Sequence, residues 1–231
     1  MKNILFILLF ISLSACWEDT TSNTKAPIVS KEKPAATNNG LTTKNALNGN
    51  ASSRSVDQKW LCIPGKQVGL ISAHTTEESI KMAYGKEHVI RRTIDVGEGE
   101  TIDGTVVFPN TDNEISIEWT RDQPFKRPAK VRIQKGNTSW KTDQNISIGT
   151  TLSQLQRINE KDFKFAGFEW DYAGYTHDWQ GGKINPKLTV FLEAGNPEAT
   201  FPDLLGDELF LSGHPKAIAA DLRVRAMVIE L

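Results

Sequence analysis

Two stretches of the chain, residues 71–80 and 146–155, carry the same pattern at an offset of 75 positions. In each stretch an isoleucine and a serine come first, a pair of threonines follows, and an aliphatic residue comes last. The matching residues are Ile71, Ser72, Thr75, Thr76 and Ile80 in the first copy, and Ile146, Ser147, Thr150, Thr151 and Leu155 in the second. A pattern that recurs at a fixed offset indicates one supersecondary unit used twice.

The first copy predicts the start of a short amphipathic helix. Thr75 and Glu78 have the spacing of a capping box, in which the two side chains satisfy free backbone amides. Gly85 provides a stop because glycine tolerates the left-handed conformation. The predicted apolar face consists of Ile80, Ala83 and Tyr84.

The second copy predicts a similar helix. Thr151 and Gln154 form the capping box, and Asn159 takes the stop position. The predicted apolar face consists of Leu152, Leu155 and Ile158.

Strand-like runs follow each helix. After the first helix the predicted strands are residues 88–94, 101–108, 114–119 and 129–134. After the second helix they are residues 163–172, 187–193, 208–211 and 222–230. We therefore expect an α+β fold of two tandem helix-then-antiparallel-sheet units, about 60–140 and about 141–231.

A change in composition sets the limits of the globular part. Polar and small residues dominate from Glu18 to about Asp57. Such a segment buries too little apolar surface to offset its conformational entropy. We predict a disordered tether over residues 16–57 and a globular domain over residues 58–231.

The first residues have the layout of a secretory signal. Lys2 precedes an apolar run from Ile4 to Leu13, which is shorter than the about 20 helical residues needed to cross a bilayer. The following Leu13-Ser14-Ala15-Cys16 resembles the lipobox of bacterial lipoproteins. The resemblance implies a signal peptide over residues 1–15, acylation of Cys16, and attachment to a membrane through acyl chains such as palmitate.

The residues after Cys16 indicate to which membrane the lipoprotein would be sorted. Trp17 stands where an aspartate would resemble an inner-membrane retention signal, so we expect the outer membrane. Glu18-Asp19 resembles the acidic tether that sends some lipoproteins to the cell surface. The periplasmic face and the external face both stay open.

The net charge and the number of cysteines limit which partners and which covalent links we expect. A formal net charge of -1 argues against nucleic-acid binding, which needs a basic face. If Cys16 carries lipid, Cys62 has no intramolecular partner for a disulfide. Because its neighbours are apolar, we predict that Cys62 is a buried thiol.

Aromatic residues concentrate in residues 163–179. Phe163 and Phe165 alternate in one register, and three further aromatic residues alternate in the other beyond Gly167. A bulge at Gly167 would bring both sets onto one face. That face is either core beneath the second helix or an exposed platform for an envelope protein or glycan. The candidate partner-binding residues are Phe168, Trp170, Tyr172 and Trp179.

The same segment offers an alternative, catalytic hypothesis. Asp171, His177 and Asp178 form an acid/base or metal cluster if the turn at residues 173–174 folds the strand back on itself. An envelope hydrolase or metal-dependent enzyme would follow. No serine or cysteine has the context of a nucleophile and no second histidine has ligand spacing, so we expect no metal or cofactor and favour a structural role.

Several short motifs together resemble a family of uncharacterised secreted or lipid-anchored proteins of Gram-negative bacteria. Besides the lipobox these are Cys62-Ile63-x-Gly65, Tyr84-Gly85, Gly97-Glu98-Gly99, the strand Ile115 to Trp119, Ser139-Trp140, Ile148-Gly149-Thr150 and Gly167-Phe168-x-Trp170-Asp171-Tyr172. The resemblance implies a fold and a location but no catalytic residues. The order of helices and strands also loosely resembles the tandem repeats of the β-lactamase inhibitor protein, which makes an enzyme inhibitor a distant alternative. We expect a lipid-anchored, non-enzymatic binding or scaffolding module.

Overall fold

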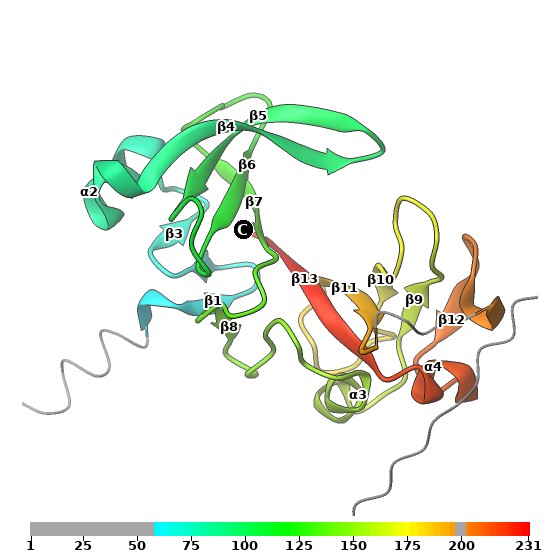
Figure 1. Cartoon of the computed structure of the whole chain (residues 1–231). Coiled ribbons are helices and arrows are strands. Elements are labelled where there is room, and N and C mark those ends of the chain that lie inside the picture. Colours follow the sequence, from blue (N-terminus) through cyan, green and yellow to red (C-terminus); the bar gives the residue numbers. More distant parts are fainter. Residues whose placement is uncertain (1–57, 197–201) are drawn as a thin grey trace, which may run out of the picture. The chain divides into compact units, whose positions relative to one another are not determined.

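The computed structural model describes residues 58–196 and 202–231. The predicted signal peptide, Cys16 and the tether lie outside the described residues. The α+β class is confirmed, with helices and antiparallel strands in the same chain (Figure 1). Within the described part, no helix is long and apolar enough to cross a membrane.

The helix-then-strands order of the sequence occurs twice, with α2 before β4 to β7 and α3 before β9 to β13. The first half holds β1 (Leu61–Ile63), β2 (Gln67–Val68), β3 (Ile71–Ser72), α2 (Glu77–Tyr84), η1 (Lys86–His88), β4 (Val89–Gly97), β5 (Glu100–Val107), β6 (Ile115–Trp119) and β7 (Pro128–Ile133). The second half holds β8 (Lys141–Thr142), α3 (Leu152–Asn159), β9 (Lys164–Ala166), β10 (Thr176–Asp178), β11 (Leu188–Ala194), η2 (Pro202–Leu204), β12 (Leu209–Leu211), α4 (Pro215–Ala219) and β13 (Leu222–Glu230).

Strands of both halves form one six-stranded sheet in the order β11-β13-β7-β6-β5-β4. All of its neighbouring strands are antiparallel. The link is β13, whose Ile229 lies opposite Leu188 of β11 on one side and Val131 of β7 on the other. Two smaller sheets, β3-β2-β1-β8 and β10-β9-β12, complete the described fold.

The repeated pattern has the same local structure in both copies. The backbone amide of Ser72 donates to Oγ1 of Thr75, and that of Ser147 donates to Oγ1 of Thr150, each at 2.9 Å. The isoleucine that precedes each serine is fully buried. Each copy therefore delivers the chain from a buried position to the start of a helix through the same turn.

The two helices begin at the second threonine of each pair. Thr151 and Gln154 form the predicted capping box. In the first copy the cap is Thr76, which accepts from the amide of Ser79 at 3.2 Å, one residue later than predicted. The hydroxyl of Thr75 instead accepts from the backbone amide of Ser72 in the preceding strand.

The helix ends differ between the copies. Gly85 ends α2 as predicted, with a φ of 95°. In the second copy the left-handed position falls on Glu160, with a φ of 56°, one residue after the predicted stop. Asn159 is instead buried within the last turn, and its side-chain amide donates to the carbonyl oxygen of Trp179 at 2.9 Å. The asparagine therefore anchors α3 to the loop after β10.

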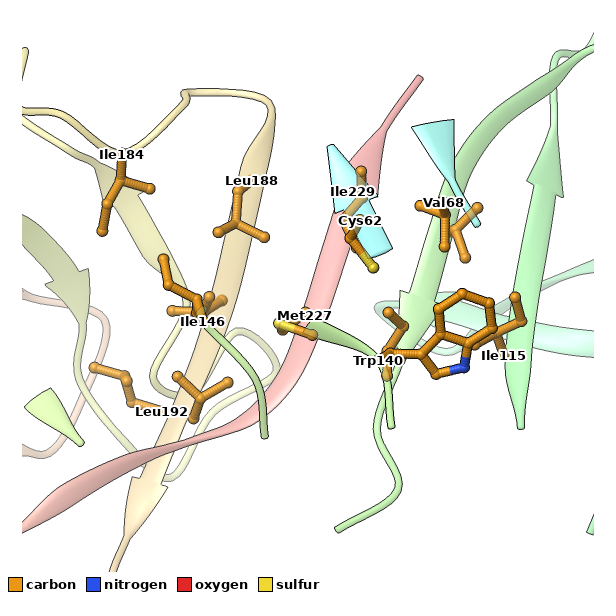
Figure 2. Close-up of a cluster of buried hydrophobic side chains, with 14 of the residues drawn as sticks. Cys62, Val68, Ile115, Trp140, Ile146, Ile184, Leu188, Leu192, Met227 and Ile229 are labelled. Atoms are coloured by element: carbon orange, nitrogen blue, oxygen red, sulfur yellow. The ribbon is translucent and has the colours of Figure 1, made fainter. Parts of the chain in front are cut away.

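One hydrophobic core joins the two halves of the described fold. In Figure 2, Met227 and Ile229 of β13 lie between Leu188 and Ile146 on one side and Trp140 on the other. All five side chains have an exposed fraction of 1% or less. Because apolar burial is the main favourable term in folding, we expect this shared core to couple the folding of the two halves.

Cys62 lies in this core. Its side chain is fully buried, which confirms the predicted buried thiol. Burial, with the negative charge of Asp143 as a lesser cause, raises the pKa of the thiol to about 12.

The predicted long strand over residues 163–172 is wrong. Only residues 164–166 form a strand (β9), and its regular pairing ends at Gly167, after which Phe168 makes a single bridge to Leu205. A Cβ on Gly167 would lie 2.5 Å from the carbonyl oxygen of Gly206 and 2.7 Å from that of Leu204. Glycine is therefore required by the close approach of the η2–β12 segment. The pairing of β9 with β10 does contain a register shift, but it lies in β10, between Thr176 and Asp178.

Candidate functional site

An open groove of about 850 Å³ covers the face of the six-stranded sheet opposite the core. Alternation along the strands decides which side chains line it. On β6 and β7 the buried set is Ile115, Ile117, Trp119, Val131 and Ile133. The alternate set, which lines the groove, is Ser116, Glu118, Lys130 and Arg132.

A β-bulge brings a second arginine into the groove. Phe191 of β11 pairs with Ala226, but the next residue of β11 pairs two positions away, which leaves Arg225 as the extra residue of β13. The guanidinium carbon of Arg225 lies 5.2 Å from the centroid of the Phe191 ring. That of Arg132, two strands from Phe191, lies at the same 5.2 Å. Both distances suit a cation–π interaction.

These two arginines lack an acidic partner. Within the described residues neither forms an ion pair, although Arg225 donates to the carbonyl oxygen of Ala173 at 3.1 Å. Burial lowers the pKa of Arg132. The nearby positive charge of Arg225 also lowers it, whereas Asp95 and Glu118 act in the opposite direction.

A line of aromatic rings runs from Phe191 to the rim of the groove. Tyr175 packs edge-on against Phe191 with ring centroids 5.6 Å apart. Tyr172 lies 6.0 Å from Tyr175, and Trp170 lies 5.3 Å from Tyr172. Separations of this size are favourable for edge-to-face pairs. The indole of Trp170 also donates to the carbonyl oxygen of Gly167 at 2.9 Å, which orients this ring.

The β4–β5 hairpin reaches the aromatic rim. Figure 1 shows its tip beside the loop that joins β9 to β10. A Cβ placed on Gly97 would lie 3.8 Å from Cε1 of Tyr172, so the two segments touch. A hydrogen bond to Glu98 raises the pKa of the Tyr172 hydroxyl. The hairpin and the aromatic loop together border one end of the groove.

The structure divides the four predicted partner-binding residues. Trp170 and Tyr172 line the groove, and Trp170 is 37% exposed. Phe168 packs partly buried against the core, with its ring 6.3 Å from that of Phe165. Trp179 is a core residue, not a surface one, because its indole donates to the buried carbonyl of Leu188 at 2.7 Å.

The predicted catalytic cluster is not assembled. Asp171 and His177 line the groove, but Asp178 does not. The carboxylate of Asp178 instead accepts hydrogen bonds from the backbone and side-chain amides of Gln180. No hydrogen bond or ion pair joins any two of the three side chains. Across residues 58–196 and 202–231, no group of three or more His, Cys, Asp and Glu side chains could hold a metal ion.

Sequence reasoning missed Arg132, Arg225, Tyr175 and Phe191. The alternation of β7 could have placed Arg132 on the face opposite Val131. The run Val224-Arg225-Ala226 likewise places Arg225 opposite two buried residues, but the bulge then shifts the parity of β13 between Ala226 and Met227, which obscures the pattern over the whole strand.

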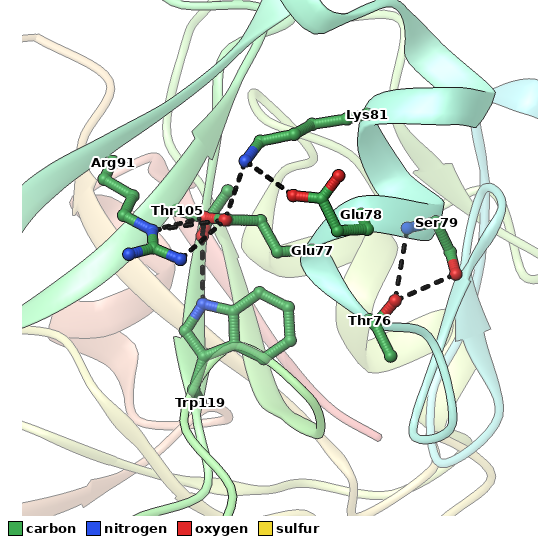
Figure 3. A network of polar contacts seen from close by, with 8 residues as sticks. All are labelled: Thr76, Glu77, Glu78, Ser79, Lys81, Arg91, Thr105 and Trp119. Carbon is green, nitrogen blue, oxygen red and sulfur yellow. Dashed lines mark hydrogen bonds and ion pairs between the residues drawn. The ribbon is translucent and has the colours of Figure 1, made fainter.

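A separate polar network ties α2 to the sheet (Figure 3). Glu77 is 2% exposed, and its carboxylate accepts hydrogen bonds from Arg91, Lys81 and the hydroxyl of Thr105. Thr105 in turn accepts from the indole of Trp119 at 3.0 Å. Burial alone would raise the pKa of Glu77, but the three donors together lower it to about 2. This network lies outside the groove, so we assign it a structural role.

The comparisons with known proteins give one distant neighbour. No family model matches the chain, and no curated protein matches it. Among solved structures, the uncharacterized protein yfeY from Escherichia coli is 11% identical with a TM-score of 0.42. The match covers 72% of this chain and 97% of that chain.

Proposed function

We propose that the chain is a lipid-anchored protein of the bacterial outer envelope that works as a non-enzymatic binding module. Cys16 would carry the lipid, and the groove would hold an envelope partner. The observation that carries the binding function is the groove itself. Its volume of about 850 Å³ falls within the range typical of ligand sites, about 300–1,000 Å³.

The lining of the groove supports recognition more than chemistry. Exposed aromatic side chains give large contact areas at low entropic cost, and arginines are enriched at binding hot spots. Trp170, Tyr172 and Arg132 belong to these residue types and meet in one groove. The acid/base pair that an enzyme would need is not joined there, because Asp171 and His177 share no hydrogen bond.

Photo-cross-linking in intact cells tests the binding function. A benzophenone amino acid in place of Tyr172 reports on the groove, and the same group in place of Met82 on α2 is the control. Met82 is 77% exposed and does not line the groove. We expect an adduct at position 172 that position 82 lacks. The same adducts at both positions, or none at 172, would rule out the groove as the binding site.

Metabolic labelling tests the anchor. Cells that express the full chain are fed an alkyne-tagged palmitate, and the membrane fractions are probed for the tag. We expect label on the wild-type protein in the outer-membrane fraction and none on Cys16→Ser. A wild-type protein without label would contradict the lipid anchor.

A further inference from the structure

We propose that the ligand of the groove is an acidic glycan. Its carboxylate or phosphate group is held by the guanidinium groups of Arg132 and Arg225. Its neighbouring sugar rings lie on Trp170, Tyr172 and Tyr175. This inference rests on the proposed binding function and names the class of ligand.

The first argument is the pattern of charge in the groove. Most other charged side chains there are matched by a neighbour of opposite sign. Arg92 pairs with Glu114 at 3.4 Å and Glu230 pairs with Lys187 at 2.6 Å, while Glu118 and Lys130 hold directly opposite positions on β6 and β7. Asp95 and Asp171 also line the groove, and neither forms an ion pair within the described residues. Arg132 and Arg225 have no carboxylate within ion-pair distance among the described residues. Asp95 and Glu118 act on Arg132 only from a distance, so an anionic group of the ligand would give the two guanidinium groups the direct hydrogen-bonded partner that neither has.

The second argument is the support of the two arginines. Both guanidinium groups lie 5.2 Å from the centroid of one ring, that of Phe191. Phe191 is 8% exposed and packed beneath Tyr175, so its position is well defined. The hydrogen bond from Arg225 to Ala173 uses only part of its five donors. The remaining N–H groups suit a carboxylate or phosphate, which arginine binds through two parallel hydrogen bonds.

The third argument separates a glycan from a peptide. An extended peptide binds a sheet by pairing with the free edge of a strand. The two arginines lie on β7 and β13, whose edges are paired on both sides, whereas residues 92–97 of the outer strand β4 line only the side of the groove. The strands that carry the two arginines therefore offer side chains and no free edge, and the acidic-peptide probe tests pairing with β4. Sugar rings have apolar C–H faces that pack on aromatic rings and hydroxyl edges that reach polar groups, which fits this lining.

Titration of the purified full chain tests the inference. The probes are a short oligogalacturonate as the carboxylate source and a phosphorylated oligomannose as the phosphate source. The methyl ester of the oligogalacturonate is the neutral match, and an oligoglutamate is the acidic peptide. We expect one of the two acidic glycans to bind at least about tenfold more tightly than the neutral ester, as a charged hydrogen bond would give.

Arginine variants locate the effect. Arg132→Gln removes the charge and keeps a polar side chain, so we expect it to abolish the preference for the acidic glycan over the neutral ester. Arg121→Gln is the matched control, because Arg121 is exposed and does not line the groove. It should retain the full preference.

The other outcomes separate this inference from the binding function. Equal binding of acidic and neutral glycans, or tightest binding of oligoglutamate, overturns the acidic-glycan inference and leaves the groove as a binding site. If no probe binds, the composition of the adduct cross-linked at position 172 decides. Uronic acid or phosphorylated sugar in that adduct supports the inference, whereas a protein or a neutral glycan overturns it. The lack of any groove-specific adduct overturns the binding function itself.

Discussion

Nη2 of Arg91 lies 2.9 Å from Oε2 of Glu77 and ties the first turn of α2 to the strand β4. Nε of the same guanidinium group approaches both carboxylate oxygens, at 3.0 and 3.1 Å. The guanidinium also covers the ring of Phe125 at 3.7 Å. A buried carboxylate with several charged and polar donors is costly to disturb, because removal of one partner leaves the other groups unsatisfied.

Replacement of this carboxylate should change how stability depends on pH. The folded pKa of Glu77, about 2, is lower than its usual value of 4.5. The network therefore stabilises the fold above about pH 4.5, and this contribution is lost as the pH falls toward 2. We expect Glu77→Gln to cost about 3 kcal/mol at pH 7 and to flatten the loss between pH 4.5 and 2. Urea unfolding at pH 7 and pH 3 measures both effects.

The control is the neighbouring carboxylate. The side chain of Glu78 is 72% exposed, and its one ion pair within the described residues is with Lys81. Glu78→Gln should therefore cost less than about 1 kcal/mol. Equal losses in the two variants would contradict the assigned role of Glu77.

The two tryptophans of the aromatic segment should respond differently to truncation. Trp179 is 5% exposed and packs on Phe163 with centroids 4.9 Å apart. Trp179→Ala leaves a cavity in the core, so we expect a loss of about 3–5 kcal/mol in unfolding free energy. Trp170→Ala removes a part-exposed ring and one hydrogen bond, which should cost about 1 kcal/mol. Chemical denaturation measures both losses. A larger loss of unfolding free energy for Trp170→Ala than for Trp179→Ala would contradict the core position of Trp179.

A methyl group at Gly167 should disturb the fold. Its Cβ would lie within 2.7 Å of two backbone oxygens, which cannot move as a flexible side chain can. We expect Gly167→Ala to lower the unfolding free energy by about 1–3 kcal/mol. Gly136→Ala is the control, since a Cβ there meets nothing within 4 Å. Similar melting temperatures for the two variants would contradict the predicted clash, because the η2–β12 segment would then have moved to make room for the methyl group.

The Cys62 thiol should be inert in the folded protein. Because its pKa is raised to about 12, almost no thiolate is present at pH 8, and burial blocks access. We expect the Cys16→Ser variant to remain unmodified by iodoacetamide at pH 8 and to take up one equivalent in denaturant, as read by mass spectrometry. Rapid modification without denaturant would mean that the core opens around β1.

Elements with strong local signals were predicted well from sequence. The closing strand at residues 222–230 and the capping box of Thr151 match the structure. Both depend on information within a few residues, namely alternation and side-chain capping. The cap of α2 was misplaced by one residue because Thr75 is used by a neighbouring turn.

Features that depend on distant segments were not accessible from sequence. The end of the strand at Gly167 is set by carbonyl groups of residues 204 and 206, about 40 positions away. The bulge at Arg225, which lines the groove, exists only in the pairing of β13 with β11. Of the predicted platform, Trp170 and Tyr172 lie at the site, but its arginines come from strands of both halves.

The place of β13 between β7 and β11 also determines when the fold can be completed. Residues 222–230 are synthesised after all other strands of the sheet, so the strands made earlier wait with two open edges. Open strand edges invite pairing with other chains, and pairing between distant segments is slow. Until its last strand is made, the chain therefore exposes the edges of β7 and β11, and premature termination would release a species prone to aggregation.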